Sequence, residues 1–472
     1  MTWARRNGWP VSMEIWRRAE VMAGRPKVYN SPMSGPQIAI GMAAVYAERR
    51  ARLARQMSGG VTIVPTALEQ QRNRDSHFPY RYDSYFYYLT GFPEPAAVLV
   101  LIAGADPKSI LFCRDKDVER EIWDGFRYGP AQARTQFGLD ECHSISEIDT
   151  LMPQLLENQP QLYCHLGDDK RWDERILGWL NAVRAQVRSG ITAPAAIHDV
   201  HALIDEMRLL KDVHELATMR RAAQISTAAH IRAMRMAKPG RAEHEVEAEL
   251  MHEFRRCGAQ APAYTPIVAG GANACVLHYV RNDAVLKSGE LLLIDAGCEL
   301  DGYASDITRT FPVNGRFSVV QRDVYQMVLA AQAAAIAVVR PGVSWNVPHD
   351  AAVRVLAQGL VDFGLCQGSV EQAIETGDYK KFYMHRTGHW LGLDVHDAGD
   401  YKRDGLWREL KPGMVLTVEP GCYIRPGEGV SESFANIGIR IEDDVLVTTA
   451  GNEVLTHAAP KTVSDIETLM RD

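Results

Sequence analysis

The chain has 472 residues, which is more than one ordinary domain holds, so two or three domains are expected. Its composition, 46% hydrophobic and 24% charged, is typical of a soluble globular protein. The formal net charge of −7 opposes binding to nucleic acid or to an anionic membrane, since both usually require a basic surface. No uncharged apolar run approaches the roughly 18 residues of a membrane-spanning helix.

Two features of the sequence bear on the cell compartment. The eight cysteines are scattered and form no CxxC pair, which favours a reducing, cytoplasmic setting. Residues 1–41 are rich in Arg and Trp but lack the apolar segment of a secretory signal. Two interpretations of these residues stay open: an organellar transit peptide, or a disordered extension, which is the one we expect.

Residues 42–208 have the pattern of an α/β domain. The pattern predicts a helix over residues 43–57, a strand over 61–66 and a fully buried strand over 96–104 with a hairpin neighbour at 109–113. Residues 83–91 alternate aromatic side chains, and further helices are expected within 145–157 and 172–188. Trp123 and Arg188 are the candidate functional residues of this domain, although composition alone favours a packed aromatic and a solvated charge there.

Residues 209–472 form the second predicted domain and open with two helices. Asp212 is a plausible N-cap, and Glu215 stands three residues on, as a capping box requires. Pro239-Gly240 separates this helix from the next, and Pro341-Gly342 separates a later pair in the same way. The recurrence indicates an internal duplication, on positional grounds.

Acidic residues end several apolar strands of the second domain. A turn within residues 299–302 would pair Asp295 with Asp306, and two carboxylates that close require a proton or a cation between them. The alternative, a hairpin shifted by one residue with Asp295 as a turn or cap residue, is less favoured because LLLID is too apolar to place Asp295 at the surface. Glu419 and Glu442 likewise end apolar runs, VLTV and GIRI. A lone buried carboxylate is costly, whereas several that converge favour a metal site.

The stretch HRTGHWLGLDVHD, residues 385–397, adds three histidines to the carboxylates. Oxygen-rich ligands with one or two imidazoles suit a pair of Mn²⁺, Co²⁺ or Zn²⁺ ions. Arg386 stands where the zincin motif HExxH has its Glu, so that motif is absent, and the nucleophile elbow GxSxG is absent too. The nucleophile that is left for hydrolysis is a metal-bridging water.

These motifs resemble a known family. IDAG, SDITRTFPV, HRTGHWLGLDVHD, VLTVEPG and GIRIEDD, with the first-domain segment DSYFYYLTGFPEPAAVLVLI, are similar to those of the Xaa-Pro aminopeptidases, also called aminopeptidase P. The resemblance runs from about residue 43 to the end. It implies the pita-bread fold of methionine aminopeptidase and prolidase, an internal pseudo-duplication, and hydrolysis of the first bond of peptides with proline in second position.

The resemblance also implies a role for each candidate residue. Asp295 would bind one metal, Asp306 and Glu442 would bridge both, and His389 and Glu419 would bind the other. Glu419 would also be the general base. The other residues would act around the substrate: His278 and His396 at the oxyanion, His385 at the substrate, Tyr423 and Arg440 as supports for the carboxylates, and Trp123 across a contact in a homo-oligomer, a dimer or tetramer.

Alternatives within and outside this family remain. A prolidase, restricted to Xaa-Pro dipeptides, uses the same ligands, although the uninterrupted HWLGLDVHD block favours the aminopeptidase. A methionine aminopeptidase needs no large first domain, and metal-free creatinase-like relatives lose the ligands. A non-enzymatic binding protein on this fold would typically lose ligands and gain basic extensions, which the intact ligands and the charge of −7 oppose.

Overall fold

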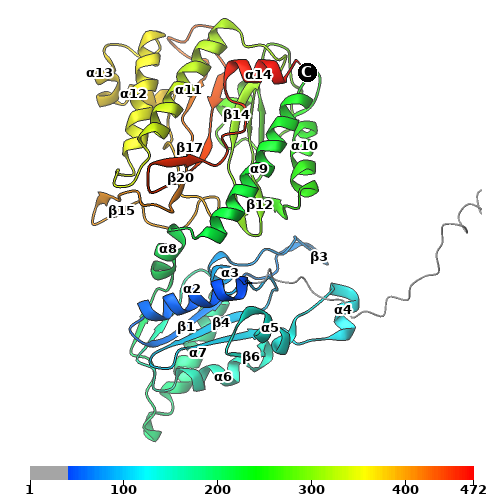
Figure 1. Cartoon of the computed structure of the whole chain (residues 1–472), viewed down its shortest axis with the longest axis vertical. Coiled ribbons are helices and arrows are strands. Elements are labelled where there is room, and N and C mark those ends of the chain that lie inside the picture. The colour runs from blue at the N-terminus through cyan, green and yellow to red at the C-terminus, as the bar shows by residue number, and fades with distance from the viewer. Residues whose placement is uncertain (1–40, 472) are drawn as a thin grey trace, which may run out of the picture.

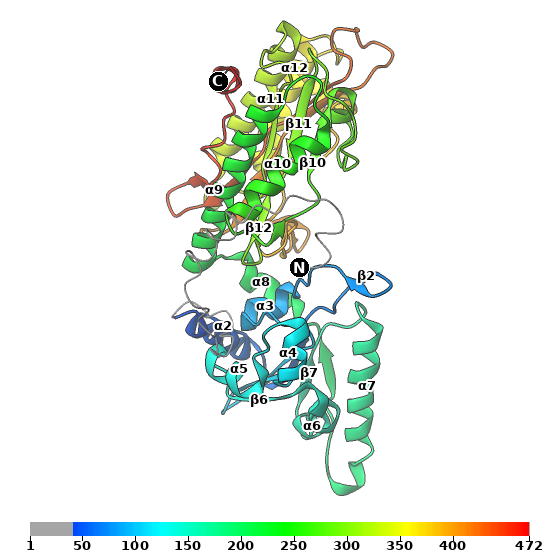
Figure 2. The same cartoon turned by 90° about the vertical axis from the view of Figure 1, so that its right-hand side faces the viewer.

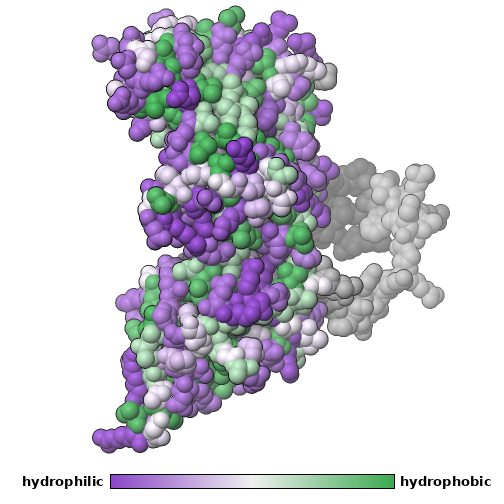
Figure 3. Space-filling model, turned by 60° about the vertical axis from the view of Figure 1, so that its left-hand side comes forward, coloured by the Kyte–Doolittle hydropathy of each residue, from purple (hydrophilic) through white to green (hydrophobic). Residues whose placement is uncertain are grey.

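A computed structural model describes residues 41–471, which form two lobes joined by helix α8 (His201–Leu209) (Figure 1, Figure 2). The expectations for the N-terminal extension lie outside the described residues, apart from Gly41. On the face in Figure 3, hydrophilic residues and small hydrophobic patches alternate over both lobes, which a constriction separates. Within residues 41–471, no helix is long and apolar enough to span a membrane.

The N-terminal lobe is built on one mixed sheet. Its central pairs, β1 with β4 and β4 with β5, are antiparallel, and the outer pairs are parallel. In spatial order the strands are β6 (Glu141–Ser144), β5 (Lys108–Cys113), β4 (Val98–Ala103), β1 (Gly60–Pro65), β7 (Gln161–Tyr163) and β8 (Ala196–His198). A separate two-stranded hairpin consists of β2 (Gln71–Asn73) and β3 (Ser76–His77).

Helices cover both faces of this sheet, so its central strands are buried on each side. Because successive side chains of a strand point to opposite faces, Leu99 and Leu101 join one buried cluster while Val98 and Val100 join another. This arrangement confirms the fully buried strand predicted over residues 96–104. The covering helices are α2 (Met42–Gln56), α3 (Ser84–Thr90), α5 (Gly129–Phe137), α6 (Ile148–Leu156) and α7 (Lys170–Arg184), whereas α4 (Val118–Asp124) has no buried residue. The alternating aromatics of residues 83–91 lie in α3.

The C-terminal lobe places strands between two helix pairs (Figure 1). The pairs are α9 (Val213–Met236) with α10 (Glu243–Arg256), and α11 (Val319–Val338) with α12 (Val347–Asp362), as the Pro-Gly recurrence predicts. The predicted capping box is present, because Asp212 accepts from the backbone of Glu215 and the Glu215 side chain accepts from the backbone of Asp212. Two short helices, α13 (Val370–Thr376) and α14 (Val463–Leu469), complete the lobe.

The strands of this lobe form several short antiparallel sheets around one buried core. The first group is β9 (Ala261–Pro262), β10 (Ile267–Gly270), β11 (Leu291–Asp295), β12 (Cys298–Leu300), β13 (Tyr303–Ala304) and β14 (Thr308–Pro312). The second group is β15 (Lys402–Arg403), β16 (Leu406–Trp407), β17 (Val415–Val418), β18 (Gly421–Ile424), β19 (Ile437–Arg440), β20 (Asp443–Val447) and β21 (Asn452–Val454).

The predicted pairing of Asp295 with Asp306 is wrong. Asp295 pairs with Thr308, and the tip of the hairpin is Asp301-Gly302, with φ angles of 49° and 84°. An Asp-Gly pair with both φ angles positive is favoured at the centre of a tight hairpin turn, which moves the midpoint one residue beyond the predicted one. Asp306 therefore lies in the irregular segment between β13 and β14.

Candidate metal centre

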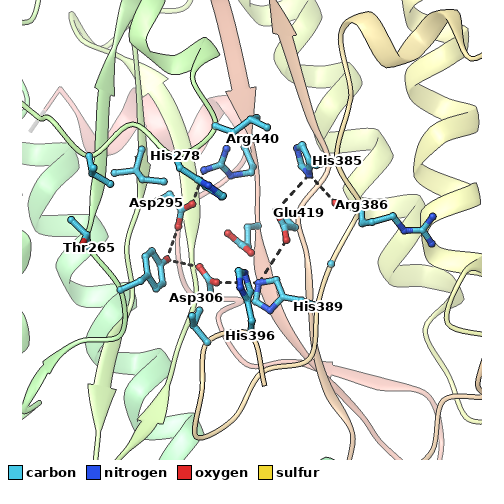
Figure 4. Close-up of a pocket in the computed structure, with 17 residues that line it drawn as sticks. Thr265, His278, Asp295, Asp306, His385, Arg386, His389, His396, Glu419 and Arg440 are labelled. Atoms are coloured by element: carbon cyan, nitrogen blue, oxygen red, sulfur yellow. Dashed lines mark hydrogen bonds and ion pairs between the residues drawn. The ribbon is translucent and has the colours of Figure 1, made fainter. Parts of the chain in front are cut away.

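A pocket of about 460 Å³ opens in the C-terminal lobe at the ends of its central strands. That volume lies within the range of small-molecule sites. Figure 4 shows acidic and imidazole side chains that point toward one another inside it. Its walls include Asp295, Asp306, Glu419, Glu442, His278, His385, His389, His396, Arg440, Tyr264 and the apolar side chains of Leu277, Val280 and Val395.

The four predicted carboxylates come from four chain segments. Asp295 ends β11 and Asp306 precedes β14, whereas Glu419 follows β17 and Glu442 precedes β20. The Tyr264 hydroxyl lies 2.5 Å from an oxygen of Asp295 and also hydrogen-bonds Asp306, so it joins these two carboxylates. Asp295 and Asp306 therefore lie close together, as predicted, although they are not cross-strand partners.

Electrostatics show that this cluster is suited to a cation. Burial first, and then the neighbouring Asp306 and Glu419, raise the pKa of Glu442 well above its usual value. Burial and Asp295 likewise raise the pKa of Asp306. Carboxylates held this close in a buried place favour either protonation or a bound metal ion. One ligand atom from each of Asp306, His389 and Glu442 lies within 4.8 Å of the others, so a single ion can reach all three.

His389 presents a defined nitrogen to this cluster. Its Nδ1 lies 2.9 Å from the backbone oxygen of Trp390, and a carbonyl only accepts, so Nδ1 carries the proton. Nε2 then lies 3.4 Å from Asp306 and 3.7 Å from Glu419. Burial lowers the pKa of His389, but the two carboxylates outweigh it and raise the pKa to about 9. A hydrogen bond that fixes the ring and its tautomer is the usual support of a metal-binding histidine.

Arg440 connects the carboxylates to the wall of the pocket. Its guanidinium donates to Asp295 at 2.6 Å, to the Tyr423 hydroxyl at 2.9 Å and to the Thr308 hydroxyl at 3.1 Å. Thr308 in turn donates to Glu442 at 2.7 Å. The guanidinium therefore orients carboxylates from both halves of the lobe.

The remaining predicted residues occupy different places. His278 and His396 are exposed on the pocket wall, and the His396 ring meets His389 edge to face at 4.4 Å. Both nitrogens of His385 are engaged, Nδ1 with the backbone oxygen of Arg386 at 2.8 Å and Nε2 with the Tyr423 hydroxyl at 2.9 Å. Trp123 lies on α4 of the other lobe, is 83% exposed and is absent from the pocket walls of this chain.

Sequence reasoning missed three polar side chains of the site: Tyr264, Thr308 and Asp444. The Asp444 carboxylate accepts from the backbone N–H of Asp306 at 3.2 Å and so holds the segment between β13 and β14. Thr308 and Asp444 lie within SDITRT and GIRIEDD, and each stands two residues after a predicted ligand. No comparable signal marks Tyr264.

Comparisons with known proteins agree with this geometry. The model of the family described as "Metallopeptidase family M24" matches residues 217–449, and the model described as "Aminopeptidase P, N-terminal domain" matches residues 46–163. The Xaa-Pro aminopeptidases of Haemophilus influenzae and Escherichia coli are 45% and 44% identical to this chain; each alignment covers 90% of it, and 96% and 97% of the relatives.

Solved structures show the same likeness. Pseudomonas aeruginosa aminopeptidase PepP superposes with a TM-score of 0.90 at 50% identity, over 92% of this chain and 98% of that one. Zn-substituted Escherichia coli aminopeptidase P in complex with product superposes with a TM-score of 0.89 at 43% identity, over 92% and 99%. Fold and site together define a metallopeptidase with a pita-bread catalytic domain, which acts on peptides with divalent metal ions. Within that class, the chain belongs to the Xaa-Pro aminopeptidases of family M24.

Proposed function

We propose that this chain uses two divalent metal ions, Mn²⁺ by preference, to hydrolyse the first peptide bond of peptides whose second residue is proline. The convergence of five predicted metal ligands from five segments on one pocket supports the proposal, and three of them lie close enough together to form one group. Asp295 would hold one ion, His389 and Glu419 the other, and Asp306 and Glu442 both. An oxygen-rich set with one imidazole suits Mn²⁺, while Co²⁺ and Zn²⁺ also fit.

Held by these five side chains, divalent ions would lower the pKa of a bound water and would polarise the carbonyl of the bond to be cleaved. The chain itself provides the proton acceptor, because burial raises the pKa of Glu419, so that carboxylate holds a proton more readily than an exposed one. His278 and His396, exposed on the pocket wall, donate to the oxyanion as it forms.

The substrate is recognised without a hydrogen bond from its second residue. Proline lacks a backbone N–H, so a pocket that accepts it must contact the ring and a tertiary amide instead. Leu277, Val280 and Val395 give the pocket an apolar wall of that kind. Arg440, through Tyr423, holds His385 beside this wall as part of the substrate site.

Substrate length separates this proposal from the prolidase alternative. We expect the purified chain to cleave an Xaa-Pro-Xaa tripeptide, to leave the matched Xaa-Ala-Xaa peptide nearly intact, and to lose activity on dialysis against a chelator. Added Mn²⁺ should restore the activity, because the carboxylates contribute to hydrolysis by holding the metal ions. Chromatography of the products is the measurement. Cleavage confined to Xaa-Pro dipeptides would make the chain a prolidase.

Tyr264→Phe tests the support of the carboxylate pair. The substitution removes the hydroxyl that joins Asp295 and Asp306 and leaves the ring. We expect kcat/KM to fall by about 10–100-fold and metal affinity to fall in the same range, as for other partners of metal ligands. Steady-state kinetics and metal titration are the measurements, with Tyr279→Phe, outside the pocket walls, as the control. Equal losses in both variants would contradict the role of Tyr264.

The same proposal covers the organisation of the chain. We place the domain boundary between residues 208 and 209, with an N-terminal α/β domain over 42–208, the pita-bread domain over 209–472, and an extension over 1–41. We also propose a homo-oligomer, dimer or tetramer, in which the exposed Trp123 of one subunit reaches the site of another. A cytoplasmic location fits the eight free cysteines, with an organelle as the alternative if residues 1–41 are a transit peptide.

A further inference from the structure

A second group of metal-binding side chains lies in the N-terminal lobe, away from the pocket. The parallel strands β7 and β8 end side by side, with Tyr163 opposite His198. His165 lies two residues beyond β7, Asp199 follows directly after β8, and His201 is the first residue of α8, three residues beyond β8. Because the carboxyl ends of parallel strands meet at one sheet edge, the three side chains come together there. None of them lines the pocket of the C-terminal lobe.

The contacts within this group are close. His165 Nδ1 lies 3.1 Å from Asp199, and His165 Nε2 lies 3.1 Å from Asp168. The rings of His165 and His201 stack with centroids 3.9 Å apart. One ligand atom from each of His165, Asp199 and His201 lies within 4.8 Å of the others. Two imidazoles with one or two carboxylates form a ligand set for a first-row transition metal rather than for Ca²⁺ or Mg²⁺.

The surroundings fix one histidine and leave the other ligands free to adjust. His201 is clamped between the His165 ring and the Tyr85 ring, which stacks on it at 3.7 Å, and the Tyr85 hydroxyl donates to Asp205 at 2.8 Å. The side chains of Asp199 and Asp168 are 54% and 77% exposed. Neighbouring ligands of a tetrahedral Zn²⁺ lie about 3.3 Å apart. His165 Nδ1 and Asp199 are already 3.1 Å apart, and the exposed Asp199 side chain can adjust toward His201.

We propose that His165, through Nδ1, together with Asp199 and His201 binds a divalent transition-metal ion such as Zn²⁺ that is distinct from the metals of the pocket. Asp168 would accept a hydrogen bond from Nε2 of His165 and so orient the ring. The ion would tie the ends of β7 and β8 to the first residue of α8. That helix joins the two lobes (Figure 1), and at its far end Arg208 contacts Asp397, next to His396. The ion would therefore stabilise the connection between the lobes.

The competing explanation is a metal-free cluster, in which a protonated His165 pairs with Asp168 and Asp199. Zinc content separates the two explanations. The full chain, loaded with its pocket metals, is dialysed against Zn²⁺, and bound zinc per chain is counted by mass spectrometry. We expect His165→Gln and His201→Gln each to bind one ion fewer than the unmodified chain. Peptide hydrolysis should be unchanged in both variants, because neither residue lines the pocket.

His143→Gln is the matched control. His143 lies within β6, an outer strand of the same sheet, 3.3 Å from the Glu141 carboxylate. Among the described residues it belongs to no group of three metal-binding side chains, so its loss should leave the zinc count unchanged. A second measurement guards against misfolding: added Zn²⁺ should raise the unfolding temperature less in His165→Gln than in His143→Gln. The proposal would be overturned if the parent and all three variants bound equal amounts of zinc, or if His143→Gln lost as much zinc as the other two variants. Either result would count whether or not the protein hydrolyses peptides.

Discussion

Asp306→Asn is expected to abolish both hydrolysis and metal uptake while the fold is retained. Asp306 contacts several residues of the centre. It hydrogen-bonds Tyr264, lies 3.4 Å from His389, and belongs with His389 and Glu442 to one group of candidate metal ligands. A neutral amide in its place removes the charge that holds the ions together. Removal of a single hydrogen-bond donor to the oxyanion of an enzyme typically lowers kcat by about 10²–10³-fold. Loss of the metal ions should therefore lower kcat/KM by more than about 10³-fold.

Stability and a control variant make this expectation specific. The amide has almost the shape of the carboxylate and reduces the repulsion among buried acids, so the metal-free variant should unfold no lower in temperature than the metal-free parent. Asp301→Asn, at the exposed hairpin tip, should keep full activity, since Asn is also favoured at that turn. Kinetics, metal analysis and thermal unfolding are the measurements. A fully active, metal-free Asp306→Asn chain would refute the mechanism.

Two of the carboxylates could be predicted because apolar strands lead directly into them. LLLI and VLTV are buried, so Asp295 at the end of β11 and Glu419 directly after β17 are directed toward the interior, where each needs partners. The helix starting at Asp212 was equally predictable, since its capping signal is local. Where the signal lay in a few neighbouring residues, the prediction and the structure agree.

The register of the hairpin depended on a finer distinction. Residues 299–302 contain several turn-forming residues, and only the φ angles of Asp301 and Gly302 place the tip. Close packing beyond the tip also matters: a Cβ on Gly297 would lie 1.6 Å from the backbone oxygen of Ser305, so the chains approach there as only glycine permits. A shift of one residue at the tip moves the partner of Asp295 by two, from Asp306 to Thr308.

Contacts between segments far apart in the sequence left no local pattern. Tyr264 reaches Asp306 across 42 residues, and Arg440 reaches Asp295 across 145. Each of these side chains has an ordinary neighbourhood in the sequence, and its partner is set by how the strands pack. Family resemblance identified Arg440, whereas physical reasoning from one sequence could not.

Asp397→Asn is expected to destabilise the chain more than any nearby surface change. The Asp397 carboxylate accepts from Arg208 at 2.6 Å and from Lys211 at 2.8 Å, and all three side chains are 1% exposed. The amide leaves Lys211 without a counter-charge in a buried place, while Arg208 keeps Asp394 at 2.6 Å. Breaking a buried pair from one side costs about 3–5 kcal/mol in the free energy of unfolding.

Asp394→Asn is the matched control, since its carboxylate is 43% exposed and also binds Arg208. An exposed partner contributes only about 0–1 kcal/mol, so the control should unfold nearly as the parent does in urea. Adding Lys211→Met to Asp397→Asn should restore part of the stability, because it removes the unpaired charge. Equal urea midpoints for Asp397→Asn and Asp394→Asn would contradict the buried pairing.

Acid unfolding gives the same network a pH signature. Burial raises the pKa of Asp397, but Lys211 and Arg208 outweigh it and hold the pKa below the usual range. A carboxyl with a lowered folded pKa contributes stability above its unfolded pKa of about 3.9 and loses it as the pH falls through the folded value. The parent should therefore lose stability below about pH 4, and Asp397→Asn should lose less over that window.

Because Asp397 follows His396, the variant should also lower kcat/KM by about 10²-fold through misplacement of that imidazole.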